Sequence, residues 1–154
     1  MTNSLDEPVS HYGGIAEGIA KGKNLEWSAF KLRKEARWHD GEPITVDDVV
    51  WTFNVFKEHG SVALKTAFID LIDVFAINDR EVCFVRDTNK EINPILPFAV
   101  GIHNIYPKHY WADKDISKTT LEPPLGSGPY RAKRWEIGRV IEYERVTDYW
   151  AQEI

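Results

Sequence analysis

Three aspartates within one short stretch could supply paired carboxylates: Asp40, Asp47 and Asp48. Such pairs act as general acid and base when their surroundings separate the two pKa values. Each aspartate also suits a structural position. Asp40 precedes Gly41 in a turn-forming sequence, and acidic residues at positions 47 and 48 suit the positive end of a helix dipole. We therefore interpret all three as turn and helix-start residues.

Histidines offer a second kind of chemistry, metal binding. His39, His103 and His109, with Asp40 or Asp113, could bind a divalent cation, because imidazole and carboxylate groups are common metal ligands. None of these histidines has the His-x-x-x-His spacing of a helical site or another tight ligand spacing. We predict that the protein uses no metal and no other cofactor. A metal-dependent or carboxylate-based hydrolase remains an alternative, supported only by these scattered residues.

Ser127 lies between Gly126 and Gly128, which raises the question of a nucleophile. A nucleophile elbow requires Gly-x-Ser-x-Gly at a strand-to-helix turn, whereas here Pro129 and then a strand pattern follow. We interpret the segment first as a turn. Its successive backbone amides could also bind an anionic group, as they do in a nest. Gly126, Ser127 and Gly128 are therefore the candidate ligand-binding residues.

Composition restricts the class of protein. The chain has 154 residues, 43% hydrophobic and 28% charged, which predicts one globular domain, and its net charge of -5 argues against nucleic-acid binding. Cys83 is the single cysteine, so no intramolecular disulfide can form, and we expect an inert buried thiol. No apolar run is long enough to span a membrane, and Asp6, Glu7 and Glu17 occupy positions where a secretory signal would be apolar. If the protein is exported, this chain is a mature piece of a longer product.

The local patterns predict strands and one well-defined helix. In residues 25–33, Ser28, Phe30 and Leu32 fall on one face of an extended segment. Thr45 and Asp48 form a capping-box pair at the start of a helix that runs to residue 57, and glycine at position 60 is a plausible stop.

The remaining patterns predict two hairpins and little further helix. Residues 74–77 and 82–85 form one hairpin, and residues 130–136 and 140–146 form another, which turns at Ile137 and Gly138. Residues 95–105 are expected to form an apolar loop, and Pro107 to begin a helical turn that ends at Trp111. We divide the chain into an irregular N-terminal segment at 1–24, a domain at 25–150 and a tail at 151–154. The predicted class is α+β with mostly antiparallel pairing.

Large aromatic side chains are frequent enough to line a ligand site. Most are expected in the core, because they lie at core-facing positions of predicted elements. The residues concerned are Trp38, Trp51, Phe53, Trp111, Trp135 and Trp150.

Three sequence blocks together resemble the bacterial extracellular solute-binding proteins of family 5, which serve peptide and nickel importers. They are FKLRKEARWHDGEPITVDDV at 30–49, LGSGPY at 125–130, and Glu144-Arg145 followed by Asp148-Tyr149-Trp150. Further short motifs at residues 4–8, 106–111 and 119–124 resemble the branch of the family that includes microcin C and oligopeptide receptors. The resemblance implies an architectural role for Asp40, Gly41, Thr45, Asp48, Gly128, Pro129 and Tyr130.

The resemblance also implies a fold and a function. Members of this family are longer, with two lobes that close on the ligand and a small extra subdomain packed on the first lobe. This chain resembles mainly that subdomain, so we expect a fragment of the receptor of an ABC importer. Such a receptor binds peptides or peptide-like compounds at the periplasmic or extracellular face of the membrane and delivers them to permease subunits, without catalysis. The alternatives are the hydrolase described above and a structural or protein-interaction module.

Overall fold

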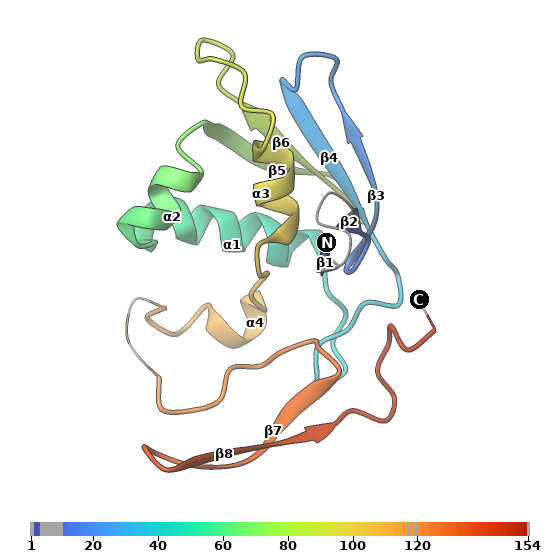
Figure 1. Cartoon of the computed structure of the whole chain (residues 1–154), viewed down its shortest axis with the longest axis vertical. Coiled ribbons are helices and arrows are strands. Elements are labelled where there is room, and N and C mark those ends of the chain that lie inside the picture. The colour runs from blue at the N-terminus through green and yellow to red at the C-terminus, as the bar shows by residue number, and fades with distance from the viewer. Residues whose placement is uncertain (1, 4–10, 117, 119, 154) are drawn as a thin grey trace.

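A four-stranded antiparallel sheet with helices on one face forms the larger part of the molecule (Figure 1). The computed structural model describes residues 2–3, 11–116, 118 and 120–153. The strand order in the sheet is β3 (Ala16–Lys21), β4 (Trp27–Leu32), β6 (Glu81–Arg86) and β5 (Leu71–Asn78). The other elements are β1 (Thr2–Asn3), β2 (His11–Tyr12), α1 (Val46–His59), α2 (Val62–Ala67), α3 (Leu96–Ile102), α4 (Lys108–Trp111), β7 (Tyr130–Glu136) and β8 (Val140–Arg145). The predicted α+β class with antiparallel pairing is confirmed.

The core lies between the sheet and α1. In β4, Ser28, Phe30 and Leu32 are buried and alternate with more exposed residues, as the sequence pattern predicted. Phe53 of α1 packs against this face, with its ring centroid 4.9 Å from that of Phe84 in β6. Its ring plane is inclined by 77° to that of Phe84, an edge-to-face arrangement that aromatic pairs favour.

Helix α1 begins with the predicted capping box. The Thr45 side chain accepts a hydrogen bond from the Asp48 amide, and the Asp48 side chain accepts one from the Thr45 amide. The helix ends at Gly60, as expected, but this glycine has a φ of -63° and so is not left-handed. A Cβ atom there would lie 2.3 Å from the Phe56 carbonyl oxygen, so glycine allows a close approach to the last turn. Gly41 does have a positive φ, 93°, which confirms the predicted turn.

Two predictions about irregular segments are wrong. Residues 95–105 were expected to form a loop, but Leu96–Ile102 form α3, whose buried side packs on the core through Leu96 and Val100. Residues 1–24 were expected to be irregular, but Ala16–Lys21 form β3. Pairing with β4 supplies hydrogen bonds that a segment with Gly18 and alternating small residues does not indicate by itself. Helix α2, capped by the Ser61 side chain, was not predicted.

Two of the short motifs that carried the resemblance are not fully described. Residues 4–8 and Thr119 of those motifs lie outside the described residues.

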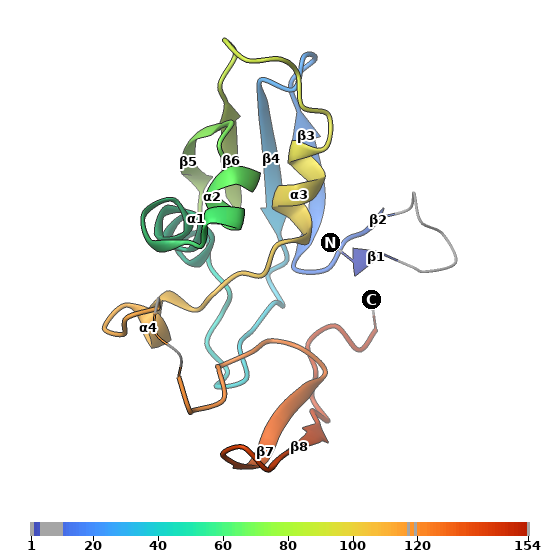
Figure 2. The same ribbon diagram turned by 60° about the vertical axis from the view of Figure 1, so that its left-hand side comes forward.

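The hairpin of β7 and β8 lies at the opposite end of the molecule from the four-stranded sheet, which both views show (Figures 1 and 2). Its strands and its turn at Gly138, with φ of 69°, agree with the predicted second hairpin. Tyr130, Trp135 and Tyr143 are all exposed on this hairpin. Most of the large aromatic side chains were expected in the core, and the exposed Trp135 is not among those that are.

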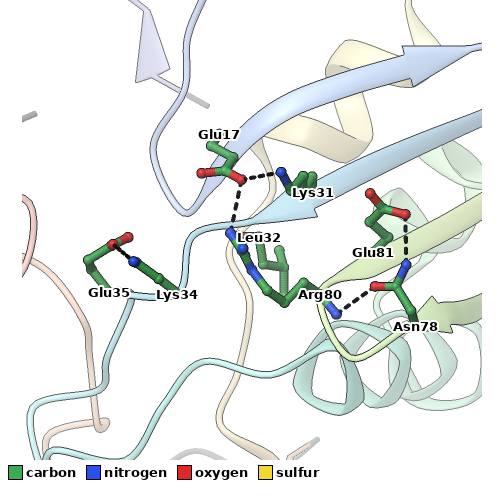
Figure 3. A network of polar contacts seen from close by, with 8 residues as sticks. All are labelled: Glu17, Lys31, Leu32, Lys34, Glu35, Asn78, Arg80 and Glu81. Carbon is green, nitrogen blue, oxygen red and sulfur yellow. Dashed lines mark hydrogen bonds and ion pairs between the residues drawn. The ribbon is translucent and has the colours of Figure 1, made fainter.

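A polar network joins the edge strand β3 to the rest of the sheet (Figure 3). The Glu17 carboxylate lies 2.9 Å from the Lys31 ammonium nitrogen and 2.9 Å from a guanidinium nitrogen of Arg80. Arg80, in the turn between β5 and β6, also donates to the Leu32 carbonyl. The hydrogen bond from Lys31 lowers the pKa of Glu17 below its ordinary value. This network therefore ties β3 and β4 to the turn between β5 and β6.

Candidate functional site

A cavity of about 510 Å³ lies beside the segment Gly126–Gly128. Its walls come from residues 14–15, 102–106, 124–128 and 149–150, together with Trp38. Aromatic side chains are prominent among them, and the described residues of the lining include no aspartate, glutamate, lysine or arginine. Pockets of this size with apolar walls and a few polar groups are typical of small-molecule and peptide sites.

The carbonyl groups of the Gly126–Gly128 segment are all hydrogen-bonded to distant residues. The His39 amide donates to the Gly126 oxygen at 2.8 Å, and the His39 ring Nε2 lies 2.8 Å from the Gly128 oxygen. The indole Nε1 of Trp150 donates to the Ser127 oxygen at 2.9 Å. One side of the segment is therefore clamped by His39 and the other by Trp150, which holds the cavity wall in place.

This bonding pattern is strand-like. Carbonyls 126 and 128 meet His39 while carbonyl 127 meets Trp150, so successive peptide groups face opposite sides. In an extended segment the N–H and C=O of one residue share a side, which would put the Ser127 amide on the side of Trp150, although residues 125–127 belong to no strand and Gly128 lies in a bend. A nest would instead require successive amides to converge on one point. Ligand binding by Gly126, Ser127 and Gly128 stays a prediction, with Ser127 as the best-placed member.

Glycine at position 126 has a local reason. A Cβ atom there would lie 3.1 Å from Cε1 of the His39 imidazole, which lies against this part of the backbone. His39 was considered as a metal ligand, but in the structure its ring and its amide both hold the loop. Nothing in the sequence indicated this pairing, because the two residues lie far apart along the chain.

Asp48 does more than cap α1. It is buried, with 3% of its surface exposed, and its carboxylate accepts from the amides of Thr45 at 2.9 Å and Lys108 at 2.8 Å. It also accepts a long bond, 3.4 Å, from the Trp38 indole. One carboxylate therefore joins the turn before α1, the start of α1 and the start of α4.

Thr52, one turn further along α1, makes a second attachment to the same segment. Its side chain is fully buried, and its hydroxyl accepts from the Tyr106 amide at 2.9 Å and donates to the Asp48 carbonyl at 2.7 Å. Together, Asp48 and Thr52 position the Tyr106–Lys108 backbone on α1. Because Tyr106 lines the cavity, helix α1 fixes that wall as well.

The three aspartates considered for catalysis do not form a carboxylate pair. Asp48 is engaged by the donors described above, while Asp47 is exposed and lies 3.5 Å from the Lys108 ammonium nitrogen. The Asp40 carboxylate accepts from the Glu42 amide, as a turn aspartate does, and lies 2.8 Å from Nε2 of His109. The interpretation of these residues as turn and helix-start groups is confirmed.

Metal-ligating side chains do not gather at one place. Within residues 2–3, 11–116, 118 and 120–153, no group of three histidine, cysteine, aspartate or glutamate side chains could hold a metal ion. The same part of the chain contains no helix of the length and apolarity needed to cross a membrane. Cys83 is buried, and burial followed by the negative charge of Asp73 raises the pKa of its thiol. That raised pKa reduces the reactive thiolate form.

The aromatic side chains divide between the core and the cavity. Trp38, Phe53 and Trp111 are buried, as predicted, and Trp51 is half-buried. Trp150 is also half-buried, but it lines the cavity and bonds the loop through its indole. Its role was not indicated by the sequence, since it depends on a contact with a loop that precedes the last hairpin.

His103 is a cavity residue that sequence reasoning named only as a metal ligand. Its imidazole lines the cavity and packs against the rings of Phe56 and Phe68, with centroids 4.9 Å and 5.1 Å away. Burial lowers the pKa of His103 below its ordinary value. At neutral pH the ring is therefore an uncharged polar group in the cavity wall.

Comparisons with known proteins agree on one family. The model of the bacterial extracellular solute-binding proteins, family 5 Middle, matches residues 12–154. A Sinorhizobium fredii protein named y4wM is 39% identical over 97% of this chain. The probable peptide-binding protein YejA of Agrobacterium fabrum is 35% identical over the whole chain. The chain spans only 23% and 26% of those two relatives, or about a quarter of their length.

A solved structure has the same arrangement. The oligopeptide-binding protein AppA from Bacillus subtilis, in complex with a nonapeptide, superposes with a TM-score of 0.72 and 29% sequence identity. The match covers 90% of this chain and 28% of AppA. The described fold therefore corresponds to one part of a two-lobed binding protein.

Proposed function

The chain belongs to the bacterial extracellular solute-binding proteins of family 5, and we propose that it forms part of a receptor that captures peptides or peptide-like compounds for an ABC importer. The family is a class of solute-binding proteins. The proposal is that a receptor containing this chain binds its ligand between two lobes, presents it to permease subunits and breaks no bond. It works at the periplasmic or extracellular face of the cytoplasmic membrane.

The observation that best supports a peptide ligand is the cavity beside Gly126–Gly128. The described residues of its lining include no aspartate, glutamate, lysine or arginine, which suits a ligand whose backbone is uncharged. The carbonyls of this segment already bond His39 and Trp150, so its backbone amides are the groups that can donate to an extended peptide, beside the aromatic side chains of Tyr149 and Trp150. The clamps from His39 and Trp150 hold this edge in place before the ligand arrives, which reduces the entropy lost on binding.

This chain alone is expected to bind peptides weakly. It spans about a quarter of the curated relatives, so most of the surface that would enclose a ligand is contributed by other segments of a family-length receptor. A ligand that remains exposed to water gains little from burial and competes with solvent for hydrogen bonds.

A chimaera provides the test. The segment of the Agrobacterium fabrum protein that aligns with this chain is replaced by residues 1–154, and a library of di- to decapeptides is titrated by calorimetry into the chimaera and into the isolated chain. We expect saturable binding of some peptides by the chimaera and weak or no binding by the isolated chain. A second chimaera with Ser127→Pro, which removes the Ser127 amide hydrogen, should bind those peptides less tightly at equal stability.

Three results would contradict the proposal. Tight, saturable binding by the isolated chain would place the main ligand site within these residues and assign the other segments a minor role. Peptide cleavage that a chelator abolishes would move the protein into the hydrolase class. A chimaera that folds cooperatively yet binds no peptide would favour the structural or interaction module.

A further inference from the structure

His103 forms part of the wall between the hydrophobic core and the proposed ligand cavity. Its ring plane is nearly perpendicular to those of Phe56 and Phe68, at 88° and 86°, and Phe53 lies 6.3 Å away, centroid to centroid. The same residue lines the 510 Å³ cavity and a small core cavity of about 70 Å³. One side of the imidazole therefore faces apolar rings, while the other faces the cavity.

The groups around His103 are uncharged. The other titratable residues in the cavity lining are Tyr106 and Tyr149, and burial raises the pKa of Tyr149, so that phenol stays neutral while the imidazole titrates. Helix α3 contains no charged residue. Lys57 of α1 donates to the Ile72 carbonyl.

The charged side chains at the neighbouring ends of α1 and α2 also have other contacts. Glu58 and His59 are exposed and lie 3.6 Å from each other, and Lys65 donates to the Glu58 carbonyl. Asp70, two residues after Phe68, pairs with Lys90 at 3.1 Å. Among the described residues, no charged group therefore stabilises an imidazolium beside Phe56 and Phe68, which agrees with burial as the cause of the lowered His103 pKa.

We propose that the protonation state of His103 sets the charge of the cavity. The neutral imidazole packs against Phe56 and Phe68, and in mild acid the protonated ring turns into the cavity and makes the cavity cationic. The consequence of this change for ligand preference rests on the function proposed above. The imidazolium cannot be solvated among phenylalanine rings, whereas water in the cavity can solvate it. The cationic cavity then favours ligands with a carboxylate, and the neutral one favours uncharged ligands.

The sign of the pH effect follows from the lowered pKa. Between the folded pKa and the unfolded value of about 6.5, the unfolded chain binds the proton more readily than the folded chain. The contribution of His103 to stability is therefore complete above pH 6.5 and is lost as the pH falls toward and below the folded pKa. Glu17 also has a lowered pKa, but because that pKa lies below 4.5, its contribution to stability is lost only in more acidic solution.

The test follows His103 by NMR in the isotope-labelled 154-residue chain without ligand, between pH 7.5 and 5.0. We expect its titration midpoint to lie below that of the same histidine in the chain unfolded by urea. The resonances of Phe56 and Phe68, and of the Tyr149 ring in the cavity lining, should shift with the same midpoint. A midpoint equal to that in urea, or a titration that leaves these three rings unmoved, would overturn the proposal.

A variant separates His103 from other titrating groups. In His103→Gln the shifts of Phe56, Phe68 and Tyr149 with pH should disappear, and the urea midpoint should change less between pH 7.5 and 5.0 than in the wild type. The matched control, His59→Gln on exposed α1 surface, should keep the wild-type behaviour. Because neither measurement needs a ligand, failure of peptide binding would refute the proposed function without affecting the proton-linked movement.

Discussion

Asp47 and Asp48 are neighbours of the same type at the start of α1, and the structure predicts that only one of them matters for stability. Replacing Asp48 by alanine removes the acceptor of the Thr45 and Lys108 amides, both within 2.9 Å, and of the Trp38 indole. A hydrogen bond to a charged group contributes about 1.5–3 kcal/mol, and the 3.4 Å indole bond adds little. We expect Asp48→Ala to lower the free energy of unfolding by about 3–5 kcal/mol.

Asp47→Ala is the matched control. It removes the same charge from the same helix turn, so the effect on the helix dipole is similar in both variants. The Asp47 side chain is 70% exposed and its pair with Lys108 is 3.5 Å long, so the expected loss is below about 1 kcal/mol.

Urea unfolding followed by tryptophan fluorescence gives the free energies, and calorimetry gives the melting temperatures. For a chain of this size Asp48→Ala should melt about 10 °C lower than the wild type, and Asp47→Ala within about 3 °C of it. Equal losses in the two variants would show that charge at the helix start, and not the buried hydrogen bonds of Asp48, stabilises this region. A loss below about 1 kcal/mol for Asp48→Ala would refute the reasoning outright.

The other predictions concern the remaining anchors of the fold. The wild-type chain should unfold cooperatively on heating, since its sheet and helices share one core, and a broad melt with random-coil circular dichroism would contradict this. Thr45→Ala should cost about 1 kcal/mol by loss of the cap and leave the affinity of the chimaera for peptides nearly unchanged, as calorimetry can show. Thr52→Val leaves the Tyr106 amide without its acceptor and should cost about 1–3 kcal/mol, and Thr52→Ser, which keeps the hydroxyl, should cost less in the same urea assay. Arg86 is buried and donates to the carbonyls of residues 25, 87, 90 and 91, so Arg86→Met should lower the unfolding free energy by about 2–3 kcal/mol. Glu17 has a lowered pKa because of its bond to Lys31, so its contribution is present above its ordinary value of 4.5 and lost as the pH falls below it; Glu17→Gln should reduce the loss of stability over that acidic range.

Features with local causes were predictable from the sequence. The capping box of α1 joins residues three apart, and the turns at Gly41 and Gly138 depend on φ values that glycine tolerates. The alternation of Ser28, Phe30 and Leu32 follows from the two-residue period of a strand. In each case the deciding interaction lies within a few residues of the pattern.

Elements that depend on distant packing were missed. Helix α3 has apolar residues on both its buried and exposed sides, so its sequence lacks the contrast that marks an amphipathic helix. Strand β3 carries a bulge between Ala16 and Gly18, which breaks its two-residue period, and its partner β4 provides the order that its own sequence lacks.

The sequence by itself determined the capped helix, the two hairpins, the α+β class and, through the order of its motifs, the resemblance to a receptor family. Tertiary structure alone decided the cavity. Its wall at Gly126–Gly128 is held by His39 and Trp150, which approach from far along the chain. It also gave Asp48 a second role. The capping box already distinguished Asp48 from Asp47, but the bond from the Lys108 amide to Asp48 depends on the packing of Tyr106–Lys108 on α1.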